Sequence, residues 1–210
     1  MKGKRVILIC SLFSAIVMFG CGNSTIKQLT MDDIKTYSNS MNNDPLSGDI
    51  TLNGKIITLP VDVKELTNMK FSFTDYFTKD QELESGYYVD GISMDGNKMD
   101  KNTRISVTIY NTSATSVSLE NAKIGEINIE KNSEAYKNTA VLPRGITLQS
   151  SYDDVIKAYG MPQCNNMSDE NSITYVAADN VDNLGRELRI VFDEGTKVIN
   201  SIKLKNIPVQ

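Results

Sequence analysis

The stretch LPRGITLQSSYDDVIKAYGMP, residues 142–162, restricts the fold more than any other part of this sequence. Ser150 or Ser151 can cap a helix, which Gly160 and Pro162 then end. A short helix with one apolar face needs a partner, and a sheet that follows it in the chain can supply that partner. The apolar residues of this helix recur at i, i+3, i+4 and i+7 and are Tyr152, Val155, Ile156 and Tyr159.

The sequence predicts strands after this helix and through most of the first half of the chain. Three strands are expected at 173–177, 187–192 and 198–204, with turns at 183–185 and at Glu194-Gly195. In the first half we expect strands near 87–94, at 104–111 (RISVTIYN), where apolar and polar residues alternate, and at 123–130. The polar segment 131–139 is the best boundary between the halves.

Asn53-Gly54 predicts a type I′ hairpin, because both central residues of this turn need positive φ. The turn would place Leu52 opposite Lys55 and Ile50 opposite Ile57. A short helix should follow Pro60, with three apolar residues inward: Val63, Leu66 and Met69. The predicted inner face of the hairpin consists of Ile50, Leu52, Ile57 and Leu59, and Thr51 and Thr58 point to the other face.

The expected fold class is α+β, with antiparallel sheets each covered by a short helix. The segments ITLPVDV (57–63) and ITLQSSYDDV (146–155) both lead a strand end into a helix, which leaves open whether the halves are tandem helix-plus-strands modules. The expected divisions are a signal peptide (1–20), a lipidated N-terminus with a polar spacer (21–46), a hairpin, helix and strand module (47–132) and a helix-plus-three-strand module (139–210). Within the spacer, Thr30 and Asp33 can cap a short helix that runs through Ser40.

The N-terminus predicts export. Basic residues 1–5 precede an uncharged apolar run, 6–20, which has the length of a signal-peptide core and is short for a membrane-spanning helix. Gly20-Cys21 at the end of this run resembles the lipobox of bacterial lipoproteins, in which the cysteine is acylated and becomes the first mature residue. The alternatives are a plain signal peptide cut elsewhere and an uncleaved anchor helix.

Charge and cysteine content restrict the partners. Cleavage before Cys21 would remove three of the 22 basic residues and none of the 26 acidic ones, leaving a net charge of −7. An acidic chain argues against binding to nucleic acid and to anionic surfaces. Cys10 would leave with the signal peptide and Cys21 would carry lipid, so Cys164 would be the one remaining thiol and no internal disulfide could form.

The sequence contains few residue patterns that could support catalysis or bind a metal. The sequence has no histidine, which excludes Ser-His-Asp and Cys-His catalysis and removes the commonest zinc ligand. Asp153-Asp154 are explained by the first turn of a helix and Asp193-Glu194 by a hairpin turn. The loop 95–102 could bind calcium through Asp95, Asn97, Asp100 and Asn102, although a polar turn explains it better and the EF-hand pattern fails. We expect no cofactor and no metal.

Tyr87, Tyr88 and Asp90 form a candidate recognition patch. The alternative is that strand alternation turns one tyrosine inward and one outward.

Gly145-Ile146-Thr147, Asp154-Val155, Tyr159-Gly160 and the closing segment LRIVFDEGTKVINSIKLKN (188–206) together resemble a known module. It is the helix-plus-meander module of outer-membrane lipoproteins of the SmpA/OmlA type, which is doubled in beta-lactamase-inhibitor-like proteins. The likeness covers about residues 143–206. The whole chain also resembles uncharacterised lipoproteins of low-GC Gram-positive bacteria. This resemblance implies binding of proteins through an open sheet face.

These observations favour a non-enzymatic, membrane-anchored extracytoplasmic lipoprotein that binds another envelope protein through a sheet face. In a Gram-positive bacterium it would lie at the cell surface. The alternatives are an inhibitor or regulator of an envelope enzyme and, less favoured, a hydrolase that uses carboxylates alone.

Overall fold

The computed structural model describes residues 29–74, 76–96, 104–131, 140–177 and 185–207. The predicted signal peptide, Cys21 and most of the candidate calcium loop lie outside these residues. Within them the predicted α+β class is confirmed, since antiparallel strands predominate and the helices are few and short. No described helix has both the length and the apolar character needed to cross a membrane.

The Asn53-Gly54 hairpin is confirmed with the predicted register. β1 (Asp49–Leu52) and β2 (Lys55–Thr58) place Leu52 opposite Lys55 and Ile50 opposite Ile57. Asn53 and Gly54 have φ of 47° and 77°, as a type I′ turn requires. β10 (Ala140–Val141) pairs with the other edge of β1, so the hairpin becomes a three-stranded sheet.

Nine described strands form the main sheet, in which all pairs are antiparallel. The strand predicted at 123–130 has the predicted bounds, and the others, including the one predicted at 104–111, shift by one or two residues at their ends. A two-stranded sheet of β5 (Glu82–Leu83) and β8 (Val117–Ser118) lies apart from it. The main sheet runs in the order β11 (Cys164–Asn166), β12 (Ser172–Val176), β13 (Arg186–Phe192), β14 (Ile199–Asn206), β9 (Lys123–Glu130), β7 (Arg104–Tyr110), β6 (Tyr88–Asp95) and β4 (Ser72–Phe73), and β3 (Val61–Asp62) also pairs with β9.

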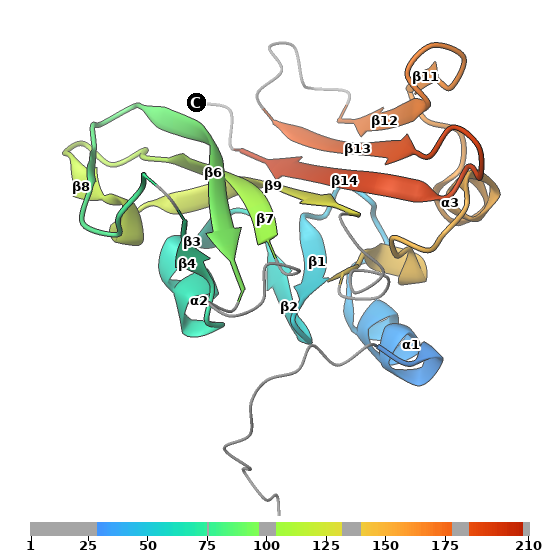
Figure 1. Ribbon diagram of the computed structural model, residues 1–210, viewed down its shortest axis with the longest axis horizontal. Helices are drawn as coiled ribbons and strands as arrows, with labels where there is room; N and C mark the ends of the chain where they lie inside the picture. Colours follow the sequence, from blue (N-terminus) through green and yellow to red (C-terminus); the bar gives the residue numbers. More distant parts are fainter. Residues whose placement is uncertain (1–28, 75, 97–103, 132–139, 178–184, 208–210) are drawn as a thin grey trace, which may run out of the picture.

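The two halves of the chain share this sheet. β14 pairs with β9 over five residues, from Ser201 opposite Glu130 to Lys205 opposite Glu126. Figure 1 shows β13, β14 and β9 side by side across the middle of the molecule. The structure therefore does not confirm an arrangement of two tandem modules, each with its own sheet.

Short helices and the hairpin sheet supply the rest of the core. α2 (Val63–Asn68) buries Val63 and Leu66 completely and half-buries Met69 just after its end, as predicted. α3 (Tyr152–Tyr159) is capped by Ser151 and buries Val155. Two 3₁₀ turns, η2 (Leu119–Asn121) and η4 (Pro143–Gly145), precede β9 and α3 respectively.

α1 (Met31–Ser40) confirms the helix predicted within the spacer. Thr30 and Asp33 form its capping box, and the Tyr37 hydroxyl donates a hydrogen bond to the Gly54 carbonyl at 3.0 Å. Ile34 packs against Val141 of β10. The helix therefore packs on the outer face of the hairpin sheet, the face to which Thr51 points.

Candidate recognition surface

The main sheet has one apolar and one polar face, because alternate residues of each strand point to opposite sides. Along one row of paired residues every side chain is buried, and along the neighbouring row every side chain is polar and partly exposed. The buried row consists of Ile92, Val107, Ile127, Leu204, Leu188 and Tyr175. The polar row consists of Ser93, Ser106, Asn128, Lys203, Arg189 and Thr174.

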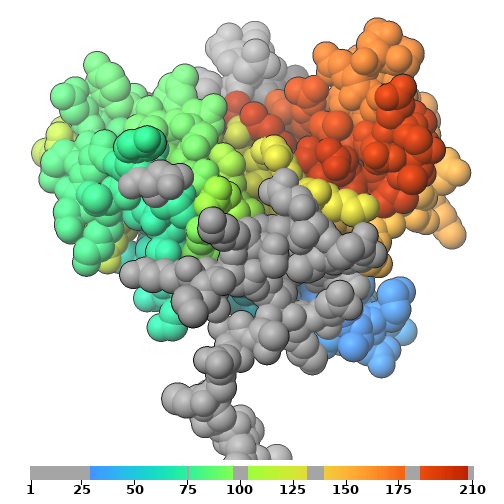
Figure 2. Space-filling view, in the orientation of Figure 1, coloured from blue at the N-terminus to red at the C-terminus, as the bar shows by residue number. Residues whose placement is uncertain are grey.

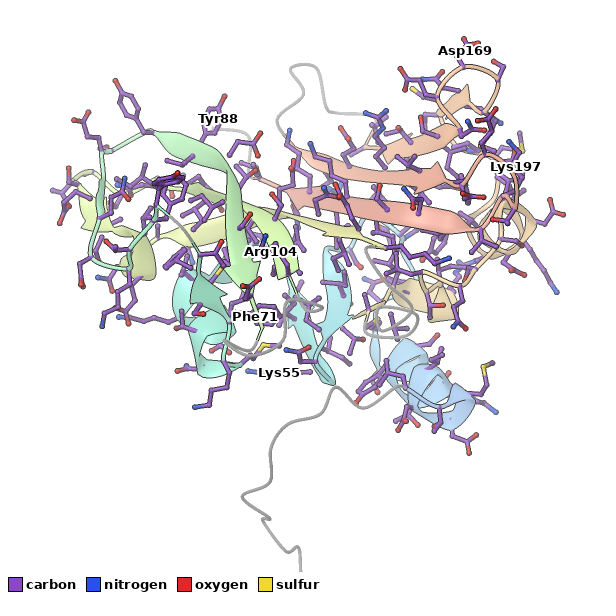
Figure 3. The ribbon with its side chains drawn as sticks, in the orientation of Figure 1. Lys55, Phe71, Tyr88, Arg104, Asp169 and Lys197 are labelled. Carbon is purple, nitrogen blue, oxygen red and sulfur yellow. The ribbon has the colours of Figure 1, made fainter. Side chains whose placement is uncertain are left out.

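Charges of both signs alternate on this polar face and pair with one another. Lys203 Nζ lies 3.1 Å from a carboxylate oxygen of Glu126, and Arg189 lies 2.8 Å from Glu170. At the opposite end of the face, Arg104 lies 2.9 Å from Asp95. Figure 3 shows Arg104 near the end of β6. No field of a single sign results, so this face is suited to a polar protein surface rather than to a polyanion.

The polar face has a shallow hollow of about 130 Å³ between Ser93, Ser106 and Asn128. Pockets for small molecules usually enclose about 300–1,000 Å³. The face is therefore better suited to a flat partner than to a small ligand.

Tyr87 and Tyr88 are both exposed, at 61% and 65% of their surface. The alternative that one of them packs inward is wrong, because Tyr87 precedes β6 in a turn and Val89 is the first side chain of the strand to pack on the core. Tyr88 pairs with Tyr110 of β7. Figure 3 shows Tyr88 at the start of β6 on the outside of the molecule.

Asp90 lies beside these tyrosines at the edge of the polar face. A bulge in β6 after Val89 lets its carboxylate accept hydrogen bonds from the Gly91 amide and the Thr108 hydroxyl, both at 2.7 Å. Glu126 lies on the far side of Thr108, at 3.5 Å from its hydroxyl. Tyr88 and Asp90 therefore extend the polar sheet face, and the predicted patch is brought together at one edge of it.

Asn111 holds the tyrosine loop, residues 83–88, in place. Its side-chain amide donates to the carbonyls of Leu83 and Thr115 at 3.0 and 2.9 Å, and its side-chain carbonyl accepts from the Ser113 amide at 2.9 Å. Its backbone exchanges hydrogen bonds with Gly86 and Tyr87. Because Asn111 is 4% exposed, these bonds are sheltered from water and fix the loop.

Asn111 was not predicted as a site residue. The sequence feature that could have indicated it is the segment NTSATS, which follows an alternating strand. Asparagine followed by small polar residues favours a turn that the asparagine side chain closes. That signal indicates a turn, but it does not indicate which loop the turn supports.

The other candidate residues have structural roles or lie apart. Cys164 is exposed on the edge strand β11. Asp154 completes the capping box of α3, and hydrogen bonds from the Ser151 amide and hydroxyl lower the pKa of its carboxyl. Hydrogen bonds from the Thr196 amide and hydroxyl likewise lower the pKa of Asp193 in its turn. Among the described residues no cluster of three or more acidic or cysteine side chains could hold a metal ion.

Comparison with protein-family models, with curated proteins and with solved structures found no match to this chain.

Proposed function

We propose that this chain is a lipid-anchored extracytoplasmic protein, without enzymatic activity, that binds another protein of the cell envelope. The binding surface is the tyrosine loop together with the adjoining edge of the polar sheet face. The observation that supports this proposal is the exposure of Tyr87 and Tyr88 on a loop fixed by Asn111.

Exposed tyrosines are suited to this role for a physical reason. A tyrosine ring buries a large area on binding, loses little side-chain entropy and is enriched at protein interfaces. A loop that is already ordered avoids the cost of ordering on binding. Asp90 adds a carboxylate, fixed by its hydrogen bonds, that can pair with a donor of the partner.

Replacing both tyrosines by serine is expected to weaken binding of the partner at least tenfold, because interface tyrosines often contribute about 2 kcal/mol each. Cross-linking in living cells, followed by mass spectrometry, should trap one dominant protein on the parent chain and much less of it on Y87S/Y88S. Tyr76→Ser is the matched control, since Tyr76 is 94% exposed and precedes the tyrosine loop. Equal capture by the double variant and the control would refute this surface.

The proposed anchor has its own prediction. The mature chain in the membrane fraction is expected to begin at Cys21 and to carry acyl chains, because Gly20-Cys21 ends the apolar run. Mass spectrometry of the N-terminal peptide reads this directly. Cys21→Ala should remove the acyl mass and release the protein from the membrane or leave it uncut. A mature N-terminus at another residue would contradict the assignment.

A further inference from the structure

A pocket of about 530 Å³ lies between α1, the segment 144–150 and α3, outside the proposed recognition surface. Its volume falls within the range of small-molecule sites, about 300–1,000 Å³. Figure 1 shows α1 below and α3 above this segment at the right side of the molecule. No part of the proposed recognition surface contributes to the pocket, so a ligand bound here would be separate from the proposed protein partner.

The base of the pocket is apolar. Ile34 of α1 and Ile146 are both buried, at 8% and 4% exposure, and Ala158 of α3 is half-buried beside them. Met31 lies at the rim with 79% of its surface exposed. Water in contact with such a base is readily displaced by an apolar chain.

Two cations line the same pocket, and neither makes a direct ion pair with a carboxylate, although the charge of Lys157 acts on Asp154 three residues earlier in α3. Arg144 donates from Nε to the Asn43 carbonyl at 3.1 Å and from its terminal nitrogen to the Ala158 carbonyl. Both acceptors are neutral, and in the described part of the chain no ion pair joins Arg144 or Lys157 to a carboxylate. The one acid in the lining, Asp154, accepts two hydrogen bonds from Ser151 in the helix cap.

The segment that carries Arg144 is held rigidly against α3. The Tyr159 hydroxyl donates to the Pro143 carbonyl at 2.6 Å, and the Tyr175 hydroxyl donates to the Gly160 carbonyl at 2.8 Å. Burial raises the pKa of both phenols, that of Tyr175 to about 12, so both remain protonated donors at neutral pH. These hydrogen bonds fix the side of the pocket that residues 143–146 and α3 form.

We propose that this pocket binds an anionic amphiphile. Its apolar chain lies against Ile34, Ile146 and Ala158, and its anionic head group lies between Arg144 and Lys157. A cationic amphiphile of the same chain length would meet two like charges and only one carboxylate, that of Asp154, and should bind more weakly. The pocket thus favours an apolar chain with an anionic head group.

The test is isothermal titration calorimetry of the full chain carrying Cys21→Ala, which has no site for acylation. Dodecanoate is the soluble probe, and dodecyltrimethylammonium is the control with the opposite charge. We expect one site for dodecanoate and much weaker binding of the cation. In a second arm, co-sedimentation with phosphatidylglycerol or phosphatidylcholine vesicles shows whether the anionic head group belongs to a membrane lipid.

Two variants locate the binding. Lys157→Glu reverses one charge, and Ala158→Leu fills the base while leaving the backbone carbonyl that Arg144 uses. Each variant is expected to weaken the binding of dodecanoate about tenfold. If only the vesicles bind, the same weakening is expected for the phosphatidylglycerol vesicles. Lys64→Glu is the matched control for charge reversal, since Lys64 is an exposed lysine of α2 outside the pocket.

Binding of either probe supports the proposal if K157E and A158L weaken that binding and K64E does not. The probe that binds, dodecanoate or phosphatidylglycerol vesicles, shows whether the ligand is a free amphiphile or a membrane lipid. Absence of binding to both probes overturns the proposal. Binding that K157E and A158L leave unchanged, in variants with the circular dichroism spectrum of the parent, also overturns it.

Discussion

Asn111→Ala is expected to lower the free energy of unfolding by about 3 kcal/mol. The variant loses four side-chain hydrogen bonds, two donated to the carbonyls of Leu83 and Thr115 and two accepted from Ser113. The cost is large because backbone groups lose partners in a site that is sheltered from water, and each such group costs about 1–3 kcal/mol. Denaturation with urea measures the loss.

The same variant tests how the tyrosine loop is held. Hydrogen exchange at the backbone amides of Gly86 and of residue 111 should become much faster, since both amides donate hydrogen bonds around the loop. Capture of the cross-linked partner should fall although both tyrosines remain. Ser113→Ala is the graded control, because it removes the Ser113 hydroxyl but leaves both bonds donated by Asn111. If N111A were no more destabilising than S113A, Asn111 would not be what orders the loop.

Ile127→Ala is expected to cost about 4 kcal/mol. Ile127 is completely buried in β9, between Leu204 of β14 and Val107 of β7. Removing its side chain loses transfer free energy and leaves a cavity in the middle of the main sheet, where neighbours on both sides prevent collapse. Asn128→Ala, one residue further on the polar face, should stay within about 0.5 kcal/mol of the parent.

This variant also tests whether the two halves unfold together. Since β9 and β14 pair directly, loss of Ile127 should lower hydrogen-exchange protection in β13 as well as in β7. Faster exchange in β7 with unchanged exchange in β13 would show that the halves open independently, and would favour the two modules predicted from the sequence.

Features with local causes could be predicted from the sequence. The hairpin follows from the backbone needs of Asn53-Gly54, and α1 and α3 begin at capping boxes formed by residues three apart. Strands β7 and β9 follow from alternation alone. In each case the physical signal and the structure it specifies lie within a few residues of one another.

Features that depend on distant partners could not be predicted. Thr51 was assigned to the outer face of the hairpin, but α1 covers that face and leaves Thr51 completely buried. β11 is short, polar and exposed, so it has no alternation to detect. The residue types indicate the recognition patch, whereas the place of Asp90 depends on a bulge in β6 and the support of the tyrosine loop depends on Asn111, twenty-one residues beyond Asp90.

The place of β14 has a consequence for how the protein is made. β14 is the last strand described, yet it lies inside the sheet between β13 and β9. The N-terminal half of the chain is synthesised first, so residues 126–130 of β9 have one edge unpaired until residues 201–205 follow, while β3 pairs with residues 123–124. Such an edge is a template for pairing with other chains. A chain that ends before β14 should therefore aggregate rather than fold as a smaller protein.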